Sequence, residues 1–156
     1  MVNDHVGGAE DRELLDALRA SWEQADPVPA GLADRMIAAV AVDDLSREFA
    51  LLSLVDGAQA AVRAGDERRT LQFADDDAEV LLHVSPTDGG ARRIDGWSRP
   101  AVLAARLAQD DAEWAADTVG DGRFSFEGVA AGRAQVRMVV RQEEGLREVA
   151  TPWFDM

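Results

Sequence analysis

The sequence contains no cysteine, no lysine and no tyrosine, and it has only two histidines, His5 and His83. Without cysteine the chain forms no disulfide bond, no thiolate metal site and no cysteine nucleophile. Without lysine it lacks the phosphate-binding loop that ends in Gly-Lys-Ser or Gly-Lys-Thr. The Gly-x-Ser-x-Gly motif of serine hydrolases is also missing. We therefore expect no catalytic residues and a protein that is not an enzyme.

No apolar run is long enough to span a membrane, and no basic segment precedes an apolar stretch near Met1. These two absences predict a cytoplasmic protein without a membrane partner. Positive charge is also scarce, because 16 arginines stand against 30 acidic residues and the net charge is −14. Such a chain repels nucleic acid and anionic lipid, so the partner we expect is a protein, and a basic one. The alternative is that the acidity only keeps the protein soluble.

Acidic side chains are abundant enough that a metal site has to be considered. The run Asp75–Asp77 is consecutive, and Asp117 is close to Asp121 in the sequence. Such oxygen ligands suit calcium, but neither spacing matches an EF-hand loop, and acid-rich turns are usually solvated. The two histidines are far apart, and His83 alternates with apolar neighbours, so we expect it on the polar face of a strand. We therefore expect no metal and no cofactor.

The first third of the chain has the periodicity of amphipathic helices, after a tail at residues 1–9 that we expect to be flexible. Apolar residues at spacings of three and four predict a first helix from Asp11, which Pro27 and Pro29 end. Its apolar stripe is Leu14, Leu15, Leu18 and Trp22. A second helix is predicted from Ala30, and its apolar face is Leu32, Met36, Ile37, Val40 and Ala41.

The chain after the second helix allows two interpretations. Asp43 and Asp44 are suitable caps for a third helix, whose apolar face is Leu45, Phe49, Leu52 and Val55. Alternatively, residues 30–55 form one long helix, because nothing after Val40 interrupts it. In either case the helical segment covers residues 10–61 with two or three helices. The Ala- and Gly-rich stretch 57–66 is typical of a linker.

After Arg68 the apolar period changes from helical to alternating, and turn residues recur at short intervals. The predicted strands are 70–73, 79–85, 92–97, 102–108, 113–118, 123–126, 134–141 and 147–153. The residues expected to point inward are Leu71, Phe73, Leu82, Val84, Ile94, Trp97, Leu103, Leu107, Trp114, Phe124, Phe126, Val136, Met138, Val140 and Val149. Seven or eight short strands predict an antiparallel β-sandwich over residues 62–156. The expected fold class is therefore α+β, with a helical segment followed by the sandwich.

The stretch 120–140 carries the clearest local signal. Asp121-Gly122 between apolar residues is typical of a tight turn, and it leads into a strand on which Phe124 and Phe126 share one face. The glycines at 128 and 132 predict a second turn that returns the chain as the strand 134–141 and completes a β-hairpin. We expect this element to build the core and not an active-site loop.

The run Asp121-Gly122-Arg123-Phe124-Ser125-Phe126, with Val129 and Gly132 after it, is similar to the D-G-x-F-x-F-x-x-V-x-x-G hairpin of carboxypeptidase-regulatory-like and other prealbumin-like β-sandwich domains. This resemblance implies a non-catalytic module for folding support, adhesion or ligand binding. The Pro-x-Pro break and the run 32–40 resemble the helical part of some actinobacterial anti-sigma regulatory proteins, without their zinc-binding His and Cys motif. That resemblance implies a regulatory protein.

Three hypotheses for the function follow. In the first, the acidic helices bind a basic protein partner such as a sigma factor, and the sandwich is a scaffold. The expected partner-binding residues are Leu14, Leu18, Trp22, Met36, Leu45, Phe49 and Trp97. In the second, loops of the sandwich bind a peptide or small ligand beside Trp97, Arg99 and Trp153. In the third, the protein is the substrate or adaptor of a neighbouring protease in a stress or phage-defence switch, and cleavage in the stretch 57–69 separates helices from sandwich.

Overall fold

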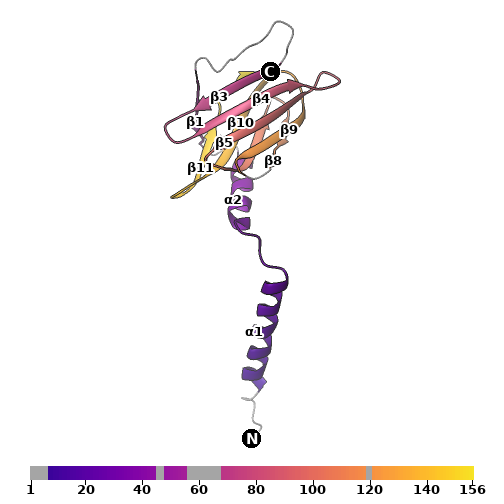
Figure 1. Cartoon of the computed structure of the whole chain (residues 1–156), viewed down its shortest axis with the longest axis vertical. Coiled ribbons are helices and arrows are strands. Elements are labelled where there is room, and N and C mark those ends of the chain that lie inside the picture. The colour runs from indigo at the N-terminus through magenta and orange to yellow at the C-terminus, as the bar shows by residue number, and fades with distance from the viewer. Residues whose placement is uncertain (1–6, 45–47, 56–67, 119–120) are drawn as a thin grey trace. The chain divides into compact units, whose positions relative to one another are not determined.

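The computed structural model describes residues 7–44, 48–55, 68–118 and 121–156. Within these ranges the chain forms two helices followed by strands in two mostly antiparallel sheets, which is an α+β fold (Figure 1). The chain divides into two compact units, Met1–Leu32 and Ala33–Met156. The predicted linker, and residues 57–67 of the predicted cleavage segment, lie outside the described residues.

The first helix, α1 (Gly7–Ala25), ends where the sequence predicts. The Asp26 N–H donates a hydrogen bond to the Trp22 carbonyl at 2.8 Å, which closes the last turn, and Pro27 follows. The helix begins at Gly7, so the prediction of a flexible tail over residues 1–9 is wrong for the last three of them. Residues 1–6 lie outside the described part.

The second helix, α2 (Leu32–Asp43), packs on the outer face of a sheet through small side chains. The residues of this contact are Ala38, Ala41 and Val42 on the helix, and Leu103, Ala104 and Val139 on the sheet. Two ion pairs add to it: Asp34 with Arg141 at 2.7 Å, and Asp43 with Arg106. Neither described helix has the length and the apolar composition needed to cross a lipid bilayer.

The described residues form twelve strands in two six-stranded sheets. The order in the first sheet is β1 (Ala50–Leu51), β11 (Gly145–Ala150), β10 (Arg133–Gln142), β6 (Val102–Ala108) and β7 (Glu113–Ala115), and β12 (Phe154–Asp155) also pairs with β10. The order in the second sheet is β2 (Ser53–Leu54), β3 (Arg69–Ala74), β4 (Glu79–Pro86), β5 (Arg92–Arg99), β9 (Arg123–Val129) and β8 (Asp117–Thr118). All neighbours are antiparallel except β1 and β11, which are parallel.

The predicted strands are found at β3 to β11, but the expected number of seven or eight is too low. The predicted strand 113–118 divides into β7 and β8, and the predicted strand 147–153 is shorter and is followed by β12. The remaining two strands, β1 and β2, come from the segment predicted to be helical.

The two sheets share one hydrophobic cluster, and we call them together the two-sheet body. Alternation places one face of each strand in this cluster: on β4, Val80, Leu82 and Val84 are buried, whereas Leu81 and His83 are exposed. The residues predicted to point inward from β3, β4, β9 and β10 are all buried. The period of two therefore identified the core of these four strands from the sequence.

The segment after α2 forms two short strands, so the predicted third helix and the long helix over residues 30–55 are both wrong. Ala50–Leu51 pairs with β11 in the first sheet, and Ser53–Leu54 pairs with β3 in the second. Leu52, between them, is buried in the core. The apolar run 49–55 fits a short buried strand as well as a helix, and packing against both sheets decides between the two.

The Asp121-Gly122 turn is confirmed. Both residues have positive φ, 49° and 80°, and β8 and β9 on either side are antiparallel neighbours. Phe124 and Phe126 are both buried, with 5.8 Å between their ring centroids. The predicted hairpin between β9 and β10 is wrong, because β9 pairs with β5 and β8 whereas β10 pairs with β6, β11 and β12. Residues 128–132 instead carry the chain from one sheet to the other.

Two residues that we expected to point inward lie elsewhere. Trp97 is exposed on the outer face of β5, because alternation along this strand places Gly96 and Ser98 inward. Leu103 lies on the outer face of β6 and packs with α2. Trp114, on the edge strand β7, does pack against the core as predicted, although it is only partly buried there.

Candidate functional site

Helix α1 exposes a row of large apolar side chains. Leu14, Leu15, Leu18 and Trp22 are exposed by 60%, 60%, 49% and 73%. The repeat of 3.6 residues per turn places these four along one side of the helix, and we call this surface the α1 stripe. Three of the predicted partner-binding residues therefore share one exposed face.

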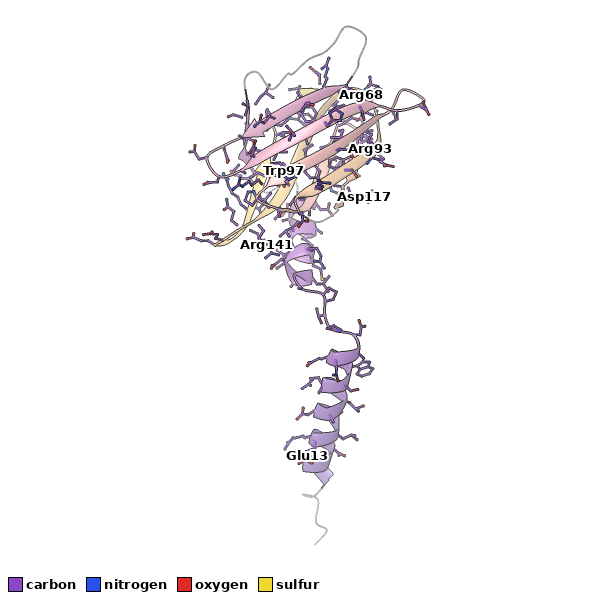
Figure 2. The ribbon with its side chains drawn as sticks, in the orientation of Figure 1. Glu13, Arg68, Arg93, Trp97, Asp117 and Arg141 are labelled. Atoms are coloured by element: carbon purple, nitrogen blue, oxygen red, sulfur yellow. The ribbon has the colours of Figure 1, made fainter. Side chains whose placement is uncertain are left out.

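The side of α1 opposite the stripe is acidic. By the same repeat, Glu13 (labelled in Figure 2), Asp16 and Glu23 lie on that side. Arg19 pairs with Asp16 at 3.5 Å. Five acidic residues and two arginines give α1 a net charge of −3. All its described side chains from Asp11 to Ala25 are exposed. Within the unit Met1–Leu32, the α1 stripe is thus left uncovered.

Helix α2 also carries apolar residues on the side that faces away from the sheet. Met36, Ile37 and Val40 are exposed, whereas Ala38 and Ala41 are buried. The large side chains of this helix therefore point outward and the small ones inward. This is the reverse of the usual arrangement for a surface helix.

The remaining predicted residues of the helical segment do not add to these faces. Leu45 lies outside the described residues. Phe49 is half-buried, and the Arg137 guanidinium lies 5.9 Å from the centre of its ring. Phe49 is thus part of the two-sheet body. Met36, Phe49 and Trp97 belong to the unit Ala33–Met156, and the α1 stripe belongs to the other unit.

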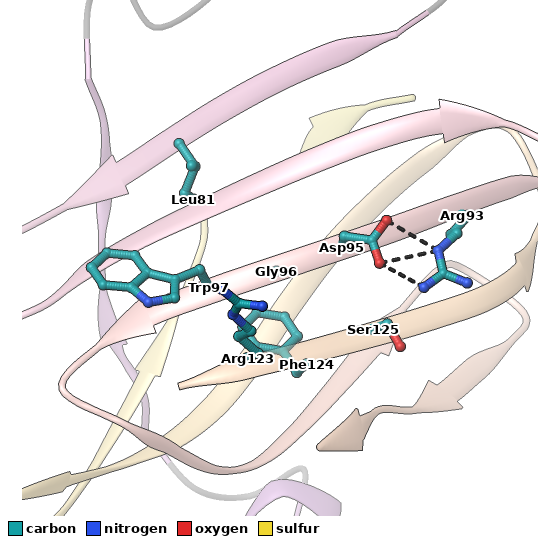
Figure 3. Close-up of a pocket in the computed structure, with 8 residues that line it drawn as sticks. All are labelled: Leu81, Arg93, Asp95, Gly96, Trp97, Arg123, Phe124 and Ser125. Carbon is teal, nitrogen blue, oxygen red and sulfur yellow. Dashed lines mark hydrogen bonds and ion pairs between the residues drawn. The ribbon is translucent and has the colours of Figure 1, made fainter. Parts of the chain in front are cut away.

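Trp97 lines a hollow on the outer face of the second sheet (Figure 3). The hollow has a volume of about 430 Å³ and lies over β5, between β4 and β9. At one end the strand register places Leu81, Trp97 and Arg123 side by side on three neighbouring strands. At the other end Asp95 lies opposite Ser125. The hollow therefore combines an aromatic ring with charged groups.

Gly96 lies beneath the hollow, and the fold requires a glycine there. A Cβ atom on Gly96 would lie only 2.2 Å from the Cζ atom of Phe124. The Phe124 ring fills this space from below and meets Phe126 edge to face. At Gly96 the backbone of β5 thus packs directly against the Phe124 ring of the core.

Two arginines beside the hollow differ in their partners. Arg93 donates from Nε to both carboxylate oxygens of Asp95 at 3.0 Å and from Nη2 to Oδ1 at 2.8 Å, and its Nη1 donates to Glu127. The hydrogen bonding to Asp95, together with the charge of that carboxylate, raises the pKa of Arg93. In the part of the chain that the structure describes, Arg123 forms no ion pair. The Arg93 guanidinium therefore faces two carboxylates, whereas no ion pair balances the charge of Arg123 among the described residues.

The other aromatic residue of the second hypothesis lies on a different sheet. Arg99 is exposed two residues after Trp97 on β5, whereas Trp153 follows β11 and lies 5.4 Å, ring centre to guanidinium carbon, from Arg133 of β10. His83 is exposed on β4, as expected, and its Nδ1 lies 3.1 Å from Thr70 Oγ1. Trp97 and Trp153 therefore belong to separate surfaces.

The acidic run 75–77 supplies a structural contact. Asp75 Oδ1 accepts hydrogen bonds from the backbone N–H groups of Asp77 at 2.9 Å and Ala78 at 2.8 Å, and Oδ2 accepts one from Arg147 Nη2 at 2.6 Å. Burial raises the pKa of Asp75, but the hydrogen bonds from Arg147 and the backbone together outweigh it, so the pKa lies below its usual value. Because Asp75 follows β3 and Arg147 is on β11, this pair ties the two sheets together.

The other considered metal site gains no support from the side chains. Among the described residues, no three His, Cys, Asp or Glu side chains gather in a way that would hold an ion. Asp117 is on β8, and Asp121 is in the following turn.

Comparison with protein-family models, with curated proteins and with solved structures found no match for this chain. The resemblances to prealbumin-like domains and to anti-sigma proteins thus depend only on the residues quoted for them. Three surfaces remain as candidates for function: the α1 stripe, the outward side of α2 with Met36, and the hollow over β5. Arg123 was not among the predicted residues, because its place beside Trp97 depends on the pairing of β5 with β9, which are far apart in sequence.

Proposed function

We propose that this protein is a non-enzymatic, cytoplasmic regulatory protein that binds a basic protein partner through the α1 stripe. In this proposal the two-sheet body is a prealbumin-like β-sandwich that serves as the scaffold. The observation that carries the proposal is the exposure of Leu14, Leu18 and Trp22 on one side of a helix in a compact unit of its own. Large apolar side chains aligned in this way are typical of a helix that docks into a groove.

The stability of α1 gives a physical reason for a partner. Its 19 residues exceed by only about one turn the length of about 12–15 residues below which an isolated helix is marginally stable in water. Helices in proteins gain most of their stability when an amphipathic face is buried. Full burial of a Leu side chain contributes about 1.5–3 kcal/mol. A groove that covers the α1 stripe would therefore stabilise the helix and bind it at the same time.

The charge of the chain favours a basic partner over a second copy. The helix has a net charge of −3 and the whole chain −14, so two copies repel each other. A groove with an apolar floor and a basic rim would match both the stripe and the negative net charge of the helix. A sigma factor is the kind of partner that the anti-sigma resemblance implies.

Site-specific photo-crosslinking tests the proposal. We would place p-benzoylphenylalanine at Trp22, in the stripe, and at Glu13, on the opposite side, as the control. The expected result is a crosslink to one protein from position 22 and none from position 13. Equal crosslinking from both positions would contradict the proposal.

The captured protein is then purified and its affinity measured by calorimetry. Trp22→Ala should weaken binding by about thirtyfold or more, because buried Trp side chains are frequent hot spots. Glu13→Gln, the matched control, should change the affinity by less than about threefold. An unchanged affinity in Trp22→Ala would overturn the proposal. So would a dimer in sedimentation that Leu18→Asp converts to a monomer, because the stripe would then bind a second copy.

A further inference from the structure

The unbalanced charge of Arg123 points to a second binding site, which does not depend on the function proposed for α1. Arg123 is paired with Trp97 across β9 and β5, and Leu81 is paired with Trp97 on the opposite side, across β4 and β5 (Figure 3). Trp97 and Leu81 are each exposed by 37%, so both offer apolar surface to a ligand. This end of the hollow thus joins a guanidinium group to an aromatic ring and an aliphatic side chain.

The other end of the hollow has a different character. There Asp95 is held by Arg93, which also bonds Glu127, so these charges are already engaged with one another. Of the two described arginines that line the hollow, Arg93 is paired and Arg123 is not, so an entering anion can pair with Arg123. A guanidinium group binds a carboxylate through two parallel N–H···O bonds, and the charge makes these stronger than neutral hydrogen bonds.

We propose that the hollow binds a small aromatic carboxylate. The carboxylate pairs with Arg123, and the ring packs against the Trp97 indole and Leu81. Aromatic rings contribute packing energy beyond the area that they bury, so the indole favours an aromatic acid over an aliphatic one of the same charge. The volume of about 430 Å³ lies within the range of about 300–1,000 Å³ that is usual for small-molecule sites.

Fluorine NMR of the full chain, labelled with 5-fluorotryptophan, tests this proposal. The four tryptophans give four resonances, and Trp97→Phe identifies the one from Trp97. During titration with sodium phenylacetate, the Trp97 resonance should shift and saturate while the other three stay in place. Arg123→Gln should weaken this binding by about tenfold or more, whereas Arg133→Gln, beside Trp153, should leave it unchanged.

The neutral analogue 2-phenylethanol separates charge recognition from simple apolar contact. It should bind at least about tenfold more weakly than phenylacetate, because it cannot pair with the guanidinium group. Three results would overturn the proposal: a Trp97 resonance that does not move, equal shifts with the neutral analogue, or an unaltered affinity in Arg123→Gln. Arg123 is exposed, so this variant is expected to fold, and its unfolding midpoint is measured as a check.

Discussion

Helix α1 and the two-sheet body use the same kinds of apolar residue in opposite ways. On α1, Leu14 and Trp22 are exposed by 60% and 73%, whereas Phe73 and Leu82 in the body are fully buried. Both elements have an apolar face, with a period of 3.6 on the helix and of two on the strands. The two sheets share one buried cluster, while the face of α1 stays exposed within its own unit. A periodic pattern thus predicts a face to be buried, but not what will bury it.

Removal of a core ring should have the largest effect on stability. Phe124→Ala should lower the free energy of unfolding by about 4 kcal/mol, because it leaves a cavity between β5 and β9 next to Phe126. Denaturant unfolding measures the change. The matched variant on α1, Leu15→Ala, should change the same quantity by less than about 0.5 kcal/mol. Equal losses in the two variants would remove the distinction between the two regions.

Added volume in the body should cost about half as much stability as removed volume. Gly96→Ala should cost about 2 kcal/mol, because the new Cβ overlaps the Phe124 ring. The double variant Gly96→Ala with Phe124→Leu should lose less stability than the sum of the two single changes. If the two losses of stability were strictly additive, overlap with the Phe124 ring would not be the reason why position 96 requires glycine.

The pair that joins the sheets should have a smaller and pH-dependent effect. Asp75→Asn should cost about 1.5 kcal/mol at neutral pH, because it weakens the hydrogen bonds with Arg147 and the backbone. The folded pKa of Asp75 is depressed, so its stabilisation is complete above the unfolded pKa and is lost as the pH falls through the folded value. The difference in the free energy of unfolding between wild type and Asp75→Asn should therefore become smaller below about pH 4.

Asp77 provides the control for this measurement. Its carboxylate is 65% exposed and lies 3.6 Å from Arg147, so Asp77→Asn should change stability by less than about 0.5 kcal/mol at any pH. A pH dependence of the same size in both variants would show that the acidic turn acts as a whole and not through Asp75.

Deletion of residues 1–31 should have the smallest effect on the body. Because α1 belongs to a separate compact unit, the free energy of unfolding of the remaining chain should stay unchanged within about 0.5 kcal/mol. The slope of this free energy against denaturant concentration should also stay unchanged. Circular dichroism at a helix band during the same experiment reports the loss of α1. A change in the free energy of unfolding well beyond this limit would mean that the helix contributes to the stability of the two sheets.

The sequence predicted the fold best where the decisive pattern is local. Alternation on β4 and the turn at Asp121-Gly122 are set by neighbouring residues, and both are confirmed. The run 49–55 was assigned to a helix because its apolar residues fit both periods. Its pairing with β11 and β3 involves residues distant in the sequence, and no local pattern reports such pairing.

The candidate surfaces also differ in whether neighbouring residues or the pairing of distant residues define them. The α1 stripe was predicted because residues on one helix define it. The outward direction of Trp97 was also present in the alternation, since a period of two from Ile94 places Gly96 and Ser98 inward. The alternation does not show that Arg123 lies beside Trp97, because that position follows from the register between β5 and β9.

The two short strands after α2 have a consequence for any break in the chain. Ala50–Leu51 belongs to the first sheet and Ser53–Leu54 to the second. Both strands come before the stretch 57–67 in the sequence. A protease that cuts within that stretch would leave β1, β2 and the buried Leu52 on the N-terminal fragment. The two pieces would then behave as a split protein whose halves complement each other and stay together until denatured. Release of the helices would require unfolding as well as cleavage.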